Sequence, residues 1–285
     1  MIQILIDSAS DITPAEAAEK GLHVIPMEVR FGEELYLDGV NLTHREFFEK
    51  LIESNDLPKT SQINEYRWHE AMEKLTANGD QVIVITLSSK LSGTYHSAVT
   101  AAKKFNGQVH VVDSLSAAIG ERILCDYALR LIAADQTAEQ IVAALEAKKH
   151  QIQIIAVVDT LKYLRKGGRI STLAAFAGEM LSIKPVISVI NGEVKLVGKA
   201  IGSKKSNNLL NQLVAKCGGI DFTLPYGLVY SGLNDAYLQK YLQDSAALWQ
   251  NEVTDIHSIP SHMIGATIGT HVGPNAIGVA FFAKN

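Results

Sequence analysis

Residues 81–98 read QVIVITLSSKLSGTYHSA, an apolar run followed by a hydroxyl-rich loop and a helix-like segment. The run 81–87 has the continuous apolar character of a strand buried on both faces. Residues 86–95 contain five serine and threonine side chains. In open α/β sheets, ligands bind outside the carboxyl ends of the strands. The hydroxyl-rich loop is therefore a candidate binding site.

The first half of the chain alternates predicted strands with predicted helices. The apolar runs and caps predict strands at 2–7, 22–29, 81–87 and 108–113, and helices at 13–21, 43–54, 64–79, 92–105 and within 116–149. Thr43 and Glu46 have the spacing of a capping box. A strand–helix alternation of this kind favours an α/β fold with a parallel sheet covered by helices on both faces.

The pattern changes near residue 150. Apolar segments predict strands at 152–159, 184–190, 193–198, 226–231, 252–259 and 276–283, and helices at 203–217 and 234–250. Asn191-Gly192 separates two of these strands, and this dipeptide is a strong signal for an antiparallel hairpin. We therefore expect an α/β domain over 1–150, a mixed α+β domain over 151–285, and a ligand site in the cleft between them.

Composition and charge exclude several classes of protein. The 285 residues are 47% hydrophobic and 20% charged, with 26 Lys plus Arg against 30 Asp plus Glu and a net charge of −4. Such a chain has no basic field for nucleic acid. No apolar run reaches the roughly 18 residues of a membrane-spanning helix, the N-terminus lacks the features of a signal peptide, and the two cysteines form no CxxC motif. We expect a cytoplasmic protein.

Ser92 is open to three interpretations. With Gly93 and Thr94 it stands at a predicted helix start, where free backbone N–H groups favour an anion. As an N-cap it would only complete its own helix. As a nucleophile it would use His96 one turn further on, but Lys90 and Thr94 occupy the positions of the two glycines in the G-x-S-x-G elbow. A hydrolase is therefore the least favoured interpretation.

Three further stretches carry candidate polar groups. KTSQ, residues 59–62, precedes a predicted helix and has the composition of a cap. Arg169 follows two glycines in KGGRIS, and His271 lies in a predicted glycine-rich turn that leads into an apolar strand. The chain contains neither a phosphate-binding G-x-x-x-x-G-K-[ST] motif nor the spacing of a zinc site. We expect no metal ion.

These stretches together resemble the DegV family. The elements that carry the resemblance, in order along nearly the whole chain, are IDSASDI near the start, TSQ at 60–62, SSKLSGTYHSA at 88–98, VVDS at 111–114, LKYLRKGGRIS at 161–171, IKPVI at 183–187 and GTHVGP at 269–274. The family includes the fatty-acid-binding subunits of bacterial fatty acid kinase. The resemblance implies a protein that holds one long-chain fatty acid between two α/β domains and has no cofactor and no catalytic residue.

The resemblance also implies roles for particular residues. Thr60 and Ser92 would hold the carboxylate of the fatty acid. A supporting head-group set would consist of Ser61, Gly93, Thr94, Arg169 and His271. Small and apolar residues of 171–183 and 276–282 would line the acyl-chain pocket, and we expect this role for Phe176, Met180, Ile187 and Phe281. The partner would be a separate ATP-dependent kinase subunit that converts the carboxylate to an acyl phosphate.

The chain departs from its relatives at one position that bears on this partner. Many relatives carry an arginine where this sequence has Ile201. A protein that senses or stores fatty acids without a kinase is therefore a second alternative, beside an acyl hydrolase that uses Ser92. Turnover of an acyl ester by the isolated protein would indicate the hydrolase. One bound lipid per chain without turnover would indicate one of the other two.

Overall fold

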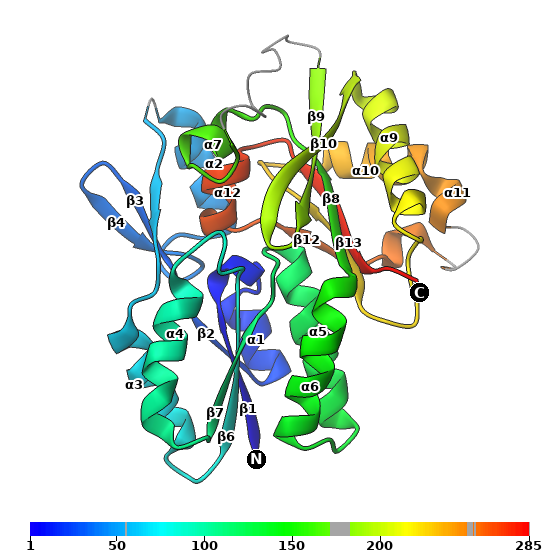
Figure 1. The fold of residues 1–285 in the computed structure, drawn as a ribbon. Helices are drawn as coiled ribbons and strands as arrows, with labels where there is room; N and C mark the ends of the chain where they lie inside the picture. The colour runs from blue at the N-terminus through cyan, green and yellow to red at the C-terminus, as the bar shows by residue number, and fades with distance from the viewer. Residues whose placement is uncertain (55, 172–182, 250–252, 254, 285) are drawn as a thin grey trace.

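The structure, a computed structural model, describes all residues except 55, 172–182, 250–252, 254 and 285. Figure 1 shows two main layers of sheet, one above the other, with helices around them. The lower sheet contains the N-terminal strand, and the upper sheet contains the last strand of the chain. The expected α/β class is confirmed.

The lower sheet is parallel, as the strand–helix alternation predicts. Its strands, in the spatial order β2-β1-β6-β7, are β2 (Leu22–Ile25), β1 (Ile2–Asp7), β6 (Gln81–Thr86) and β7 (Val109–Asp113). Alternate residues face opposite sides of a strand. Leu5 and Val84 therefore pack in one core cluster, and Ile4 and Ile83 in another. Both faces are buried, which explains the continuous apolar runs.

Helices cover both faces of the parallel sheet. They are α1 (Pro14–Lys20), α3 (Glu65–Thr76), α4 (Thr94–Ala102), α5 (Ile119–Ala133) and α6 (Ala138–Lys148). Thr13 caps α1, and Gly21, with φ of 68°, ends it. Helix α5 lies between the two main sheets, since its Ile119 and Ile123 share a core cluster with Ile154 of the upper sheet.

The upper sheet is mixed. Its strands, in the spatial order β10-β9-β8-β13-β11-β12, are β10 (Glu193–Ile201), β9 (Ile183–Ile190), β8 (Ile152–Val157), β13 (Ile277–Phe282), β11 (Tyr226–Tyr230) and β12 (Ser261–Met263). Only the pairing of β11 with β12 is parallel. The predicted hairpin joins β9 to β10, with φ of 51° at Asn191 and 83° at Gly192, as a type I′ turn requires.

The described helices that follow residue 150 divide between the two faces of the upper sheet. They are α7 (Lys162–Lys166), α9 (Ser203–Lys216), α10 (Ala236–Asp244), α11 (Ala246–Trp249) and α12 (Ala266–Val272). Leu210 of α9 and Leu238 of α10 pack with Val279 and Phe281 of β13 on the outer face. Helix α12 instead lies beside α2 and α7 (Figure 1).

A small antiparallel sheet lies beside the two main ones. It consists of β4 (Glu34–Leu37), β3 (Glu28–Phe31) and β5 (Lys59–Ser61), and α2 (His44–Glu53) follows β4 with the predicted capping box. The prediction of one strand over 22–29 was wrong. Pro26 has no backbone N–H, and β2 and β3 on its two sides belong to different sheets.

A second prediction was wrong near the C-terminus. Among the described residues of the strand expected over 252–259, Ile256–Ser258 form a short 3₁₀ helix, and the Asp255 side chain accepts the N–H of His257 at its start. The other 3₁₀ helices are Ser8–Ser10, Lys103–Phe105 and Lys149–Gln151. Among the described helices, none combines the length and the apolar character needed to span a membrane.

Two buried carboxylates attach helix α12 to the N-terminal half of the chain. Asp11 Oδ1 accepts the backbone N–H of Gly265 at 2.8 Å. Asp38 accepts the N–H of Ala266 at 2.9 Å and of Thr267 at 3.0 Å, one with each oxygen. Both acids are at most 2% exposed. They satisfy the N–H groups that every helix start leaves open, and they fix the helix that lines the site described next.

Candidate functional site

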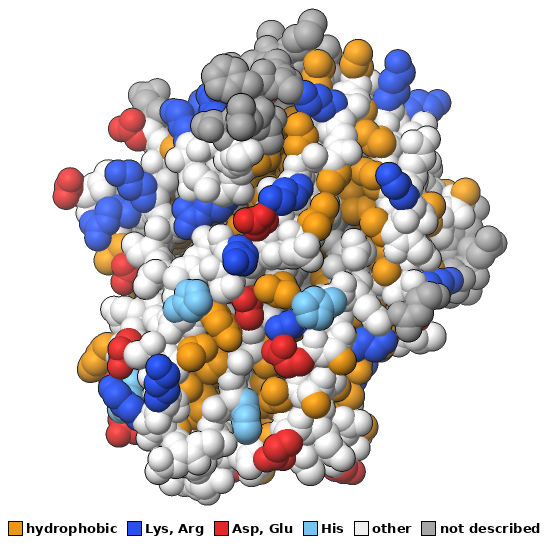
Figure 2. Space-filling model, viewed as in Figure 1, with side chains coloured by type: hydrophobic (Ala, Val, Ile, Leu, Met, Phe, Trp, Pro, Cys, Tyr) orange, Lys and Arg blue, Asp and Glu red, His pale blue; other side chains and the backbone are white. Residues whose placement is uncertain are grey.

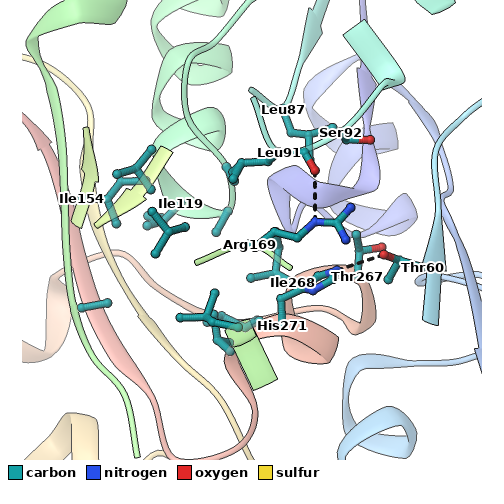
Figure 3. A pocket seen from close by; sticks show the side chains of 18 of the residues that line it. Thr60, Leu87, Leu91, Ser92, Ile119, Ile154, Arg169, Thr267, Ile268 and His271 are labelled. Atoms are coloured by element: carbon teal, nitrogen blue, oxygen red, sulfur yellow. Dashed lines mark hydrogen bonds between the residues drawn. The ribbon is translucent and has the colours of Figure 1, made fainter. Parts of the chain in front are cut away.

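A cavity of about 110 Å³ lies between the two main sheets, beside α12. Its apolar lining comes from Met27, Leu87, Leu91, Ala117, Ala118, Ile119, Ile154, Ala156, Leu164, Ile187, Val189, Val194, Val229, Ile264, Ile268 and Val272. Its polar lining comes from Thr60, Ser61, Gln62, Ser92, Arg169, Thr267 and His271. Figure 3 shows several of these side chains directed into the cavity.

The hydroxyl-rich loop is held at the carboxyl edge of the parallel sheet. Asp7, at the end of β1, accepts the backbone N–H of Leu87 at 2.9 Å, and burial raises the pKa of this carboxyl to about 7. The Ser88 hydroxyl donates to the carbonyl of Gly192 at 2.8 Å, which ties the loop to the tip of the β9–β10 hairpin. Strand β9 also lines the cavity, so this bond connects two of its walls.

Ser92 lies in this loop just before helix α4. Helix α4 starts at Thr94, with Gly93 in the cap position and no side-chain cap bond, so the interpretation of Ser92 as the N-cap is off by one residue. The Ser92 hydroxyl accepts the N–H of Thr94 at 3.2 Å and shares a hydrogen bond with the Thr94 hydroxyl at 2.9 Å. The Ser92 side chain is thereby oriented while it lines the cavity.

Thr60 and His271, which are 211 residues apart in sequence, are in direct contact. Thr60 Oγ1 and His271 Nε2 are 2.9 Å apart. Thr60 lies in strand β5, paired with Val29, and not at a helix start, because Asn64 is the N-cap of α3. His271 lies in the last turn of α12 and not in an open turn. Both positions correct the sequence-based prediction.

Gly167 leaves room for the His271 ring. A Cβ atom at Gly167 would lie 2.2 Å from His271 Nδ1, a distance that real Cβ atoms do not reach. Position 167, the first glycine of KGGRIS, therefore requires glycine because its backbone lies so close to the imidazole of His271. Nδ1 itself is buried and has no hydrogen-bond partner among the described residues.

The polar end of the cavity contains one fixed charge. Arg169 donates to the carbonyl of Leu91 at 3.1 Å (Figure 3) and to that of Gly167 at 2.6 Å, so it connects the Ser92 loop to the glycine turn. Of the described residues that line the cavity, Arg169 alone carries a formal charge at neutral pH. Burial, with a smaller contribution from Arg169, lowers the pKa of His271 to about 4. The imidazole is therefore neutral, and the guanidinium provides the positive potential.

An open vestibule adjoins the polar end of the cavity. Its walls share Thr60, Arg169 and His271 with the cavity. Its further lining consists of Arg30, Gly32, Asp56, Leu57, Pro58, Lys59, Tyr163, Lys166, Gly167 and Thr270, so its described charges are four basic and one acidic. Figure 2 shows lysine and arginine side chains over β3, β4 and α7 on this face.

Two of the basic vestibule residues face each other across strands. Arg30 of β3 and Lys59 of β5 are directly paired in the antiparallel ladder. Like charges in opposite positions destabilise a sheet. Such a pair is favourable when an anion lies between the two cations, so the vestibule has the charge pattern of an anion site.

The structure brings together most of the predicted site residues. Thr60, Ser61, Ser92, Arg169, His271 and Ile187 line the cavity. Thr94 is buried beside Ser92, and its Oγ1 accepts the N–H of Ile63 at 3.3 Å, while Gly93 packs against the side chain of Gln62. Thr94 and Gly93 therefore support the residues that line the cavity without being part of its described lining.

One predicted pocket residue lies elsewhere. Phe281 belongs to the core on the outer face of the upper sheet and is absent from the described cavity lining. The alternation along β13 directs it away from the cavity. Phe176 and Met180 fall outside the described residues.

Sequence reasoning missed Gln62 and Thr267, which also line the cavity. Gln62 ends the KTSQ stretch that sequence reasoning had already noted. Thr267 belongs to no motif that the sequence analysis singled out. Its place in the cavity wall depends on helix α12, which was not predicted as a helix.

The described residues do not form a hydrolytic site around Ser92. Its hydroxyl is paired with Thr94, while His96 is exposed on α4 and its ring packs on Tyr95. A nucleophilic serine needs a base within hydrogen-bond reach. No cluster of three or more His, Cys, Asp or Glu suited to a metal ion occurs in the described part of the chain.

The fold and the cavity define a class of α/β proteins with an apolar ligand cavity between two sheets. The chain matches the family model described as "Uncharacterised protein, DegV family" over residues 1–284. A DegV domain-containing protein of Deinococcus radiodurans is 35% identical to it, with 98% of this chain and 97% of that protein covered. The chain therefore belongs to the DegV family.

Solved structures of two family members match the whole fold. One, from Thermus thermophilus and described as a fatty acid-binding DegV family protein, has a TM-score of 0.85 and 27% identity, and covers 99% of both chains. The other, DegV from Bacillus subtilis, described as a fatty acid binding protein, has a TM-score of 0.82 and 28% identity, also with 99% of both chains covered.

The depressed pKa of His271 is open to direct measurement. We expect the imidazole C2 proton of His271 to titrate with a pKa of about 4 in the ligand-free protein. Because this value is below the unfolded value of 6.5, neutral His271 stabilises the fold above pH 6.5, and that contribution is lost as the pH falls toward 4. NMR titration measures the pKa, and His271→Asn assigns the resonance. A midpoint near 6.5 would contradict the burial of the ring.

Proposed function

We propose that this protein binds one long-chain fatty acid in the cavity and presents its carboxylate to a separate ATP-dependent kinase subunit. The observation that carries the proposal is the form of the cavity. It has apolar walls and an end lined by hydroxyls, one guanidinium and a neutral imidazole, and at that end it shares lining residues with a basic vestibule. The fatty acid binding described for its structural relatives supports the same ligand.

The apolar walls account for most of the proposed affinity. Each buried methylene group contributes about 0.8 kcal/mol. A carboxylate buried without partners costs several kcal/mol, and hydrogen bonds to a charged group, at about 1.5–3 kcal/mol each, offset that cost. We assign these bonds to Thr60 and Ser92, with Arg169 providing positive potential nearby. Ser61, Gly93, Thr94 and His271 support the head-group site.

The contact between Thr60 and His271 determines where the hydroxyl proton of Thr60 points. If the neutral imidazole carries its proton on Nε2, it donates to Thr60 Oγ1. The Thr60 hydroxyl then directs its own proton to the carboxylate. His271 is a positioning residue in this arrangement, and burial keeps it neutral over the physiological pH range.

The proposed kinase step places new negative charge in the vestibule. A carboxylate oxygen attacks the γ-phosphorus of ATP, the bond from that phosphorus to the bridging oxygen breaks, and ADP leaves. The product is an acyl phosphate. Lys59 and Lys166 line the vestibule and not the cavity, so we assign them to the phosphoryl group.

Two alternatives are less favoured. An acyl hydrolase would need a base for Ser92, and the nearest candidate by sequence, His96, is exposed. A sensor or store would need no kinase, and Ile201, where relatives carry arginine, keeps this alternative open. Ile201 is 59% exposed at the end of β10 and belongs to the described lining of neither the cavity nor the vestibule. The missing arginine therefore removes no cation from the proposed phosphoryl site.

We expect Ser92→Ala and Thr60→Ala each to weaken fatty acid binding by about 10- to 150-fold, the equivalent of one charge-assisted bond at roughly 1.5–3 kcal/mol. Titration with a fluorescent fatty acid measures the dissociation constant. Thr100→Ala is the matched control, because this hydroxyl donates to the carbonyl of His96 on exposed α4. Unchanged affinity in both site variants would remove the proposed carboxylate contacts.

We expect Lys59→Ala and Lys166→Ala to bind fatty acid within about twofold of wild type but to form acyl phosphate roughly fivefold to tenfold more slowly. The assay combines ATP, the loaded protein and the kinase subunit encoded in the same genome. Lys103→Ala, at an exposed lysine that follows the C-terminal end of α4, serves as control. Normal rates in both vestibule variants contradict the phosphoryl assignment, and a wild type inactive with every such kinase would favour the store or sensor.

A further inference from the structure

One buried hydroxyl in the cavity has no partner. Thr267 is 3% exposed and lines the cavity, and its Oγ1 makes no hydrogen bond within the described part of the chain. Leaving a buried hydroxyl unpaired is unfavourable. The Thr270 hydroxyl of the same helix is satisfied, because it donates to the carbonyl of Ala266, one turn earlier, at 2.9 Å. Thr267 is the second residue of α12 and has no carbonyl of the helix one turn before it.

The backbone fixes where this hydroxyl lies. The N–H of Thr267 donates to Asp38, so the start of α12 is held in place. Thr267 and His271 are four residues apart and therefore share a face of the helix, about 6 Å apart along its axis. Figure 3 shows both side chains at the cavity.

Thr267 lines the cavity and is absent from the described vestibule lining, and Figure 3 shows it beside Thr60 at the polar end. His271 lines both the vestibule and the cavity, whereas Thr267 and Ile264, nearer the start of α12, line the cavity alone. Its neighbours Ile264 and Ile268 are apolar. The hydroxyl is therefore an unpaired polar group next to the proposed carboxylate contacts, within reach of the carboxyl end of a bound acyl chain.

We propose that Thr267 is a specificity-determining residue that hydrogen-bonds a hydroxyl near the carboxyl end of the ligand. The substrate class that follows is a 3-hydroxy fatty acid, which this chain binds more tightly than the plain fatty acid of the same length. The inference rests on the proposed fatty acid site and refines its ligand. A site built to pair a ligand hydroxyl discriminates against the analogue that lacks it, because the protein hydroxyl is then left unpaired.

The experiment compares 3-hydroxypalmitate with palmitate by calorimetric titration of the delipidated full-length protein. We expect wild type to bind the hydroxylated lipid about fivefold or more tightly. Thr267→Val, which keeps the shape and removes the hydroxyl, brings the ratio to about one. Thr267→Ser, which keeps the hydroxyl, retains the preference. It therefore shows that the effect of Thr267→Val does not come from misfolding. Thr270→Val, the control, also retains it, because that hydroxyl is already bonded within the helix.

Three results would overturn the inference. Equal affinity of wild type for the two lipids removes it while leaving fatty acid binding in place. A Thr267→Val variant that weakens both lipids by the same factor assigns the hydroxyl to the carboxylate instead. Failure of wild type to bind either lipid rejects the inference together with the proposed function.

Discussion

The site depends on the attachment of the start of α12 to two buried carboxylates. Three consecutive backbone N–H groups, from Gly265 to Thr267, donate to Asp11 and Asp38. Burial raises the pKa of Asp11 well above its usual range, while the bond from Gly265 lowers it. A helix of seven residues is too short to be stable alone. Its place between the two halves of the chain, and hence the position of His271, follows from these contacts.

The same attachment explains the electrostatics of the cavity. Helix α12 closes one wall and buries the imidazole of His271, whose pKa falls to about 4. The positive potential at the polar end then comes from Arg169, which is fixed by two backbone carbonyls. A carboxylate placed there meets hydroxyl donors and a nearby cation, while its chain extends along apolar walls. The arrangement favours an amphiphilic anion over a neutral or fully polar ligand.

The sequence predicts the regular parts of this fold well, because buried strands, caps and the Asn191-Gly192 turn depend on local patterns. It fails where distant contacts decide. Thr60 lies in a three-residue strand that exists only by pairing with β3, and α12, which carries His271, forms against residues more than 200 positions away. A cavity lining and a core have the same composition, so the direction of Phe281 was not predictable from apolarity, and Thr267 gave no signal at all.

The central claim is that the protein holds one fatty acid by its chain and carboxylate and does not transform it. Native mass spectrometry of the purified protein, with and without added palmitate, tests this most directly. The account predicts a saturable adduct of one fatty acid per chain that is released unchanged on denaturation. A protein that takes up no fatty acid at saturating concentration, or that hydrolyses an acyl ester with a covalent adduct on Ser92, would contradict it.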